Sequence, residues 1–83
     1  MKITIKYFAS LREALGVSEE EFVSQAGTVK ELMHELVLRG ESYRTAFTSI
    51  KGLRCSVNQE LCEPIHLLAE GDEVAFFPPV TGG

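Results

Sequence analysis

The amphipathic pattern that begins at Thr28 constrains the fold more than any other feature of the sequence. Thr28 and Glu31 have the spacing of a capping box, and Gly40 is a natural helix stop. Between them the apolar residues repeat at helical spacing: Val29, Leu32, Met33 and Leu36. A chain of 83 residues folds as one domain, so this main helix has to cover a sheet with its apolar stripe.

Five stretches have the alternation or the composition of β-strands. They are residues 2–8, 19–23, 53–57, 60–62 and 73–77, with Asn58-Gln59 as a turn between the third and the fourth. The order of elements predicts an α+β domain in which a mixed sheet carries one main helix on one face. We expect the first and last strands to be parallel neighbours.

Two connections are less regular. Ser10 and Glu13 have the spacing of a helix start, and Gly16 follows as a stop, so a short helical turn is predicted there. Between the main helix and the third strand we expect a loose region that contains Tyr43 and Phe47.

Charge and the amino-terminal pattern limit the kind of protein. The net charge of -4 argues against non-specific nucleic-acid binding, which requires a surplus of Lys and Arg. Residues 1–5 alternate between apolar and polar types, unlike a signal peptide or a membrane span, so a cytoplasmic protein without membrane contact is expected. Glu19-Glu20-Glu21 is interpreted as a solvated acidic run that guides docking to a basic partner.

No group of residues has the spacing of a metal site or of a catalytic triad. Cys55 and Cys62 lack a Cys-x-x-Cys spacing, and we interpret both as small packing residues in preference to a redox pair. His34 and His66 stand far apart in the sequence, and nothing supplies the remaining ligands of a metal ion. We therefore expect no metal.

Consecutive phenylalanines in the last strand point to opposite faces of the sheet. Phe76 shares its face with Val74 and is assigned to the core, so Phe77 faces outward. Phe8 lies on the outer side of the first strand by the same count. Together they predict an apolar patch for partner docking, with Leu61 as a weaker candidate for the same surface.

The chain ends in Pro78-Pro79-Val80-Thr81-Gly82-Gly83. Two prolines stiffen the chain, and two glycines give the smallest cross-section that a peptide can have. Extended, residues 78–83 reach at most about 20 Å, enough to enter a partner's pocket as a protruding tail. The diglycine alone fits a reactive end and a frayed end equally well.

Three motifs resemble a known family. They are residues 71–83 with the sequence Gly-Asp-Glu-Val-Ala-Phe-Phe-Pro-Pro-Val-Thr-Gly-Gly, then Val57-Asn58-Gln59, and Phe8-Ala9 with Arg12-Glu13. The sequence resembles the small, sulfur-carrying subunit of molybdopterin synthase, a ubiquitin-like protein of the β-grasp fold. The resemblance implies a single sulfur-carrier domain over residues 1–83.

The resemblance also implies a function for Gly83. An ATP-dependent activating enzyme would adenylate its carboxylate, sulfur would replace AMP, and the resulting thiocarboxylate would serve the large subunit of molybdopterin synthase. The chain would then be one subunit of a heteromeric sulfurtransferase, with no complete active site and no bound cofactor of its own. The residues expected to contact partners are Phe8, Leu61, Phe77, Pro78, Pro79, Val80, Thr81 and Gly82.

Other functions use the same ending. A ubiquitin-like protein modifier and a thiamine-pathway sulfur carrier both need a diglycine carboxylate, and a plain binding module would leave it inert. Residues 76–81, Phe-Phe-Pro-Pro-Val-Thr, favour the molybdopterin carrier among these alternatives.

Overall fold

A computed structural model describes residues 1–79 of the chain. The elements in this part follow in the order β1 (Lys2–Tyr7), α1 (Ser10–Leu15), β2 (Glu19–Val23), α2 (Val29–Val37), α3 (Glu41–Ser49), β3 (Arg54–Val57), β4 (Glu60–Cys62) and β5 (Glu73–Phe77). All five predicted strands are present, and the first ends at Tyr7, one residue earlier than expected.

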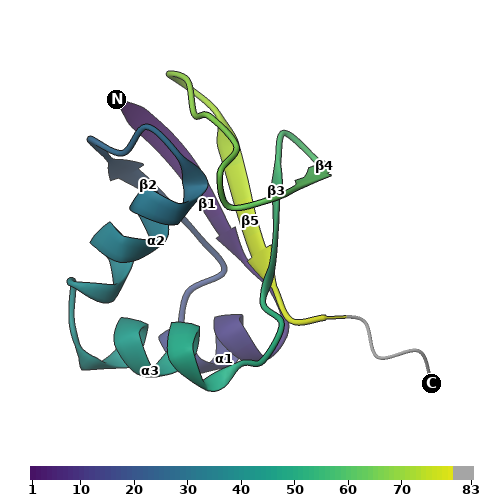
Figure 1. Cartoon of the computed structure of the whole chain (residues 1–83). Helices are drawn as coiled ribbons and strands as arrows, with labels where there is room; N and C mark the ends of the chain where they lie inside the picture. The colour runs from purple at the N-terminus through teal and green to yellow at the C-terminus, as the bar shows by residue number, and fades with distance from the viewer. Residues whose placement is uncertain (80–83) are drawn as a thin grey trace.

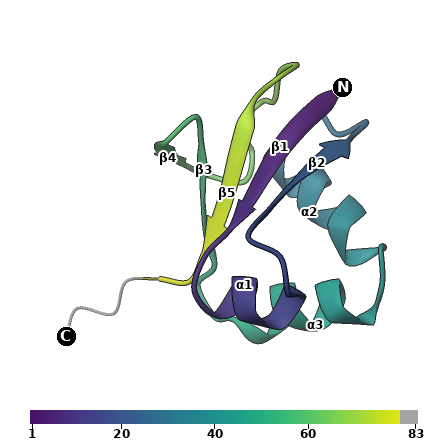
Figure 2. The ribbon, with the colours of Figure 1, turned by 180° about the vertical axis from the view of Figure 1, so that it is seen from behind.

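The strands form one mixed sheet in the order β2-β1-β5-β3-β4. β1 and β5 are parallel neighbours, as predicted, and the other pairs are antiparallel. Figures 1 and 2 show α2 over one face of the sheet, with α1 and α3 at the end where β1 and β5 finish. The other face carries no helix, and the chain leaves the end of β5 on the side away from α2.

The core lies between the sheet and the three helices. Its fully buried side chains include Ile3, Ile5, Tyr7, Leu11, Val29, Leu32, Leu36, Val74 and Phe76. These residues come from β1, α1, α2 and β5, so the apolar faces predicted for the main helix and the first and last strands meet in one cluster.

The capping box predicted for the main helix is present. The Thr28 hydroxyl accepts a hydrogen bond from the Glu31 amide at 3.2 Å, and the Glu31 carboxylate accepts one from the Thr28 amide at 3.1 Å. The helix ends at Val37, before the expected stop, because Gly40 serves instead as the N-cap of the next helix.

The prediction of a loose region around Tyr43 and Phe47 is wrong, because these residues lie in α3. Ala46 and Phe47 are buried, and the Phe47 ring packs edge-on against Phe76 with centroids 5.1 Å apart. Tertiary packing therefore makes a helix of a segment whose own residues favour it only weakly.

The connections confirm two predicted turns and correct one detail. Gly16 ends α1 in the left-handed conformation, and Asn58 and Gln59 both have positive φ, as a two-residue hairpin turn requires. Ser10 does not cap α1: the N-cap is Ala9, with no side-chain hydrogen bond, and Ser10 is already helical.

The interpretation of Glu19-Glu20-Glu21 as a solvated run is wrong for its middle member. In a strand the central residue of three points to the opposite face. The Glu20 carboxylate accepts hydrogen bonds from Tyr7 Oη at 2.7 Å, Tyr43 Oη at 3.1 Å and Arg39 Nη1 at 2.7 Å. These bonds join β2 to β1, to α3 and to the α2–α3 connection.

The Glu20 network controls the protonation of its members. Burial disfavours the Glu20 carboxylate, but the hydrogen bonds from Tyr7, Arg39 and Tyr43 outweigh it and hold the pKa below the ordinary value. The pKa of Tyr7 is raised, first by burial and then by its bond to Glu20. Glu20 is therefore an anion and Tyr7 a neutral donor at neutral pH.

Glu20→Gln should destabilise the chain by about 2 kcal/mol at neutral pH, because two phenols and a guanidinium lose a charged acceptor. Since the folded-state pKa lies below the ordinary 4.5, this stabilisation is complete above that pH and is lost as the pH falls through the folded-state value. Urea unfolding at a series of pH values measures both effects. The matched control is Glu19→Gln, whose carboxylate makes only a surface contact of 4.0 Å with Lys6. Equal losses in the two variants would contradict the role given to Glu20.

Candidate functional site

The helix-free face of the sheet is divided into a charged part and an apolar part. Lys2 pairs with Glu21 at 3.9 Å near the start of β1, and Lys6, near the end of β1, pairs with Glu73 at the start of β5 at 3.5 Å. Phe8 and Phe77 lie toward the end where both strands finish. The apolar end is the one from which the chain continues into the tail.

We call Phe8, Phe77, Pro78 and Pro79 the tail-base surface. Phe8 is 45% exposed, and its amide donates to the Phe76 carbonyl at 3.1 Å, which places it beside the end of β5. Phe76 is fully buried while Phe77 is half-buried, so the predicted division of the two rings between the faces is confirmed. Phe77 is more covered than expected because β5 is a central strand.

Arg54 is a neighbour of this surface that the sequence interpretation missed. It stands directly opposite Phe77 in the β3–β5 register, and its side chain is exposed. The alternation of β3 showed that Arg54 faces away from the core, but only the register puts it beside Phe77. The tail-base surface therefore has a cation at its edge.

The tail base rests on the loop before β3. A Cβ added to Gly52 would meet Pro79 Cγ at 3.6 Å, so this loop lies in close contact with the second proline. Pro78 and Pro79 are half-buried, and their fixed φ angles set the direction in which the chain leaves β5. The predicted contacts at Val80, Thr81 and Gly82, and the predicted reactive end at Gly83, lie outside the described residues.

Leu61 is exposed to 59% but is not part of the tail-base surface. It stands opposite Ser56, which in turn stands opposite Ala75. Strand β3 thus separates Leu61 from Phe77, and a partner would have to span three strands to contact both.

Within residues 1–79 the structure holds no group of three or more His, Cys, Asp or Glu side chains placed to bind a metal ion. His34 and His66 are both exposed. In the same residues, no helix has the length and apolar character needed to cross a bilayer.

Comparison with known proteins defines the class. The model of the ThiS family matches residues 5–83, and the chain belongs to this family. SAMP1 from Haloferax volcanii has a similar structure, with a TM-score of 0.79 and 26% identity over 100% of both chains. The predicted ubiquitin-like β-grasp fold is confirmed by such neighbours.

Within the ThiS family, the chain is similar to sulfur carrier subunits of molybdopterin synthase. The molybdopterin synthase sulfur carrier subunit of Escherichia coli (strain K12) is 40% identical over 81 residues, which cover 98% of this chain and 99% of the relative. In a complex of subunits 1 and 2 of molybdopterin-converting factor from Helicobacter pylori, one chain matches with a TM-score of 0.66 and 25% identity, over 100% of both chains. The resemblance drawn from the sequence is confirmed.

Substitution of the two adjacent rings should separate core from surface. Phe76→Ala should cost about 3 to 5 kcal/mol, because it empties a buried site between Tyr7 and Phe47. Phe77→Ala should cost about 1 kcal/mol, since the ring is only half-buried. The measurement is the urea midpoint of each purified variant at unchanged slope. Comparable losses would overturn the assignment of faces.

Proposed function

We propose that this chain carries sulfur for molybdopterin synthesis and delivers it from a thiocarboxylate on Gly83. The observation that carries the proposal is the 40% identity with the Escherichia coli sulfur carrier subunit along nearly the whole of both chains.

The chemistry begins with an unreactive group. A carboxylate resists nucleophiles because it is already an anion, so an activating enzyme first transfers AMP from ATP to Gly83 and releases pyrophosphate. A sulfur nucleophile then displaces AMP and leaves a thiocarboxylate, which attacks the pyranopterin precursor. In this division of labour the carrier brings the sulfur atom, and the partners position it and stabilise developing charge.

The geometry at the end of β5 supports this role. β5 is held between β1 and β3, and Pro78-Pro79 continues it from the end of the sheet, on the side of β3 and away from α2. A partner that contacts the tail-base surface therefore also lies next to the tail. We propose that the large subunit of molybdopterin synthase docks there and that the adenylating enzyme uses the same end of the domain.

The proposed function also determines which cofactor, location and partners we assign to the chain. It needs no bound cofactor, because ATP is consumed by the activating enzyme. We place it in the cytosol, where ATP is available, and we assign it no nucleic-acid partner, in keeping with its net charge of -4.

A second candidate is a protein modifier joined through Gly83 to lysine side chains. The structural similarity to SAMP1 from Haloferax volcanii favours this candidate, because SAMP1 is named small archaeal modifier protein 1. A modifier would need the same kind of domain and a diglycine end. The two functions share the adenylation step and differ in the nucleophile that attacks the adenylate. The thiamine-pathway carrier differs only in the final acceptor.

Removal of Gly83 should abolish carrier function without unfolding the domain. After incubation with the activating enzyme, ATP and a sulfur donor, the full chain should gain the mass of sulfur minus oxygen, and the shortened chain should not. Reconstitution with the large subunit and precursor should then yield dithiolene only from the full chain. Activity in the shortened chain would overturn the mechanism, and lysine-linked adducts on many proteins would favour the modifier.

Phe8→Ala and Phe77→Ala should each weaken binding to the large subunit by about tenfold or more, as expected for aromatic anchors of an interface. Leu38→Ala is the matched control, because Leu38 is 74% exposed and belongs to the α2 end, away from the tail-base surface. Isothermal titration of the folded variants measures the effect. Unchanged affinity in both aromatic variants, or an equal loss in the control, would show that docking occurs elsewhere.

A further inference from the structure

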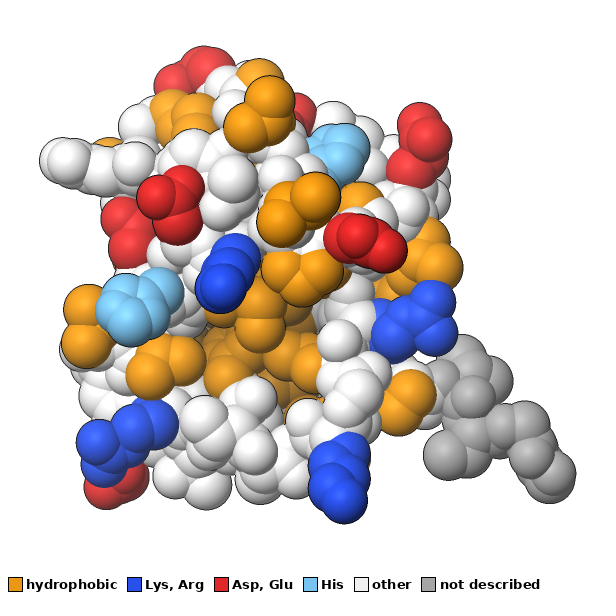
Figure 3. Space-filling model, in the orientation of Figure 1, with side chains coloured by type: hydrophobic (Ala, Val, Ile, Leu, Met, Phe, Trp, Pro, Cys, Tyr) orange, Lys and Arg blue, Asp and Glu red, His pale blue; other side chains and the backbone are white. Residues whose placement is uncertain are grey.

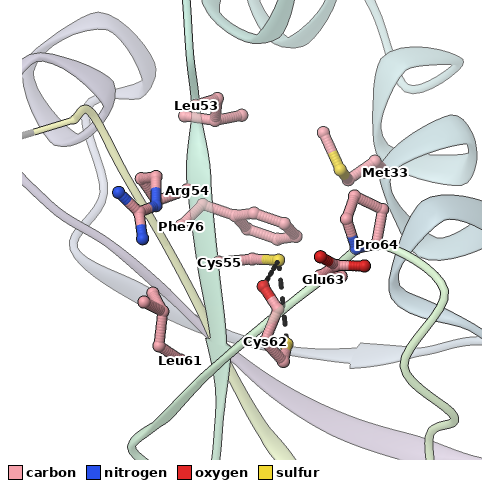
Figure 4. A pocket seen from close by; sticks show the side chains of 9 residues that line it. All are labelled: Met33, Leu53, Arg54, Cys55, Leu61, Cys62, Glu63, Pro64 and Phe76. Carbon is pink, nitrogen blue, oxygen red and sulfur yellow. Dashed lines mark hydrogen bonds between the residues drawn. The ribbon is translucent and has the colours of Figure 1, made fainter.

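The two cysteines are 7 residues apart in the sequence and face each other across two neighbouring strands. Cys55 on β3 and Cys62 on β4 are direct partners in the antiparallel register, and their Sγ atoms are 3.8 Å apart. The Cys55 Sγ also lies 3.4 Å from the Cys62 carbonyl oxygen (Figure 4). Both are free thiols in this structure.

The pair lies at a pocket of about 430 Å³ between α2, β3 and β4. Figure 3 shows hydrophobic side chains gathered in a hollow on the face that carries α2. Met33, Leu53, Pro64 and Phe76 line the pocket beside the cysteines, with Arg54 and Glu63 as its charged members. Cys55 is buried and Cys62 is half-buried, so a reagent that enters the pocket reaches the Cys62 sulfur first.

We propose that Cys55 and Cys62 are a reversible thiol–disulfide site, which closes by exchange with a low-molecular-weight disulfide such as oxidised glutathione. In the first step the Cys62 thiolate attacks the small disulfide, forms a mixed disulfide and releases one small thiolate. In the second, Cys55 loses its proton and attacks the Cys62 sulfur, which breaks the mixed disulfide and releases the second small thiol. Two protein thiols are oxidised, and one small disulfide is reduced to two thiols.

The backbone geometry suits this bond. Residues directly opposite in an antiparallel pair have Cα atoms about 4.5 to 5.5 Å apart, within the range of about 4.4 to 6.8 Å found for disulfides. The sulfurs have to approach from 3.8 Å to about 2.0 Å, which rotation of the two side chains and a small shift of β4 can supply. β4 is a three-residue edge strand whose one ladder is to β3, and the next backbone anchor is the Lys30 amide, which donates to the Pro64 carbonyl at 2.8 Å, so a shift would be confined to β4 itself.

The surroundings set the order of the two steps. Burial, followed by the neighbouring Cys62 sulfur, raises the pKa of the Cys55 thiol, while the Arg54 charge lowers it by less. Cys55 is therefore a poor first nucleophile, and its attack becomes effective only when a mixed disulfide has formed beside it. Proximity then compensates for its small thiolate fraction.

The closed bond would connect β4 covalently to β3. Leu61 adjoins Cys62 and points to the helix-free face, so the bond would also fix the strand that presents this exposed side chain. Because the bond restrains the unfolded chain, the oxidised form should melt about 5 to 15 °C above the reduced form.

The experiment is to incubate the full folded chain with graded ratios of reduced to oxidised glutathione, trap free thiols with an alkylating reagent and measure intact mass. Wild type should lose two hydrogens, take up no alkyl group, remain monomeric on a non-reducing gel and return to two free thiols with dithiothreitol. Cys55→Ser should stop at one glutathione on Cys62, and Cys62→Ser should react far more slowly because Cys55 is buried.

Other outcomes would overturn the site. They are glutathione retained on the folded wild-type chain without ring closure, dimers linked by disulfides, or closure only in denaturant. A lower melting temperature of the oxidised form would contradict the inference that the folded hairpin accommodates the bond. The double substitution of both cysteines by Ser controls for changes at other residues, because it should show no mass change and no shift in melting temperature with glutathione ratio.

Discussion

The parallel pairing of β1 with β5 is the contact on which the rest of the structure depends. It joins two strands from opposite ends of the chain, with Tyr7 beside Phe76 in register and their rings 6.5 Å apart. Phe47 of α3 packs edge-on against both rings. Without this pair the sheet would divide into β2–β1 and β5–β3–β4, and neither part alone would give α2 the apolar surface that the whole sheet offers.

Local patterns were sufficient to predict most of the fold, because strands and the main helix repeat apolar residues at their own periods. They failed at α3, where Tyr43, Ala46, Phe47 and Ile50 do have helical spacing. The intervening serines and threonines have low helix propensity and obscured it, and the helix forms because Phe47 is buried against Tyr7 and Phe76. Glu20 shows the same limit: its burial follows from strand alternation, but its three donors come from distant segments.

In the candidate site, too, some features followed from local patterns and others did not. Alternation along β5 was enough to assign Phe76 to the core and Phe77 to the other face. The position of Arg54 opposite Phe77, and of Leu61 beyond β3, depends on register between strands far apart in sequence, which no local pattern encodes. The cysteine pair could have been predicted. A two-residue turn at Asn58-Gln59 makes Val57 and Glu60 partners, and counting two residues away from the turn on each strand puts Cys55 opposite Cys62.

The central position of β5 has a mechanical consequence. A tail drawn into a partner's channel pulls on the carboxyl end of β5, along the strand and across two hydrogen-bonded ladders, to β1 on one side and β3 on the other. Such a load shears many hydrogen bonds at once, whereas a tail attached to an edge strand would peel them one at a time. Tension on the chain beyond Phe77 would therefore be shared by both ladders, and the sheet should resist a pull that would unravel an edge strand.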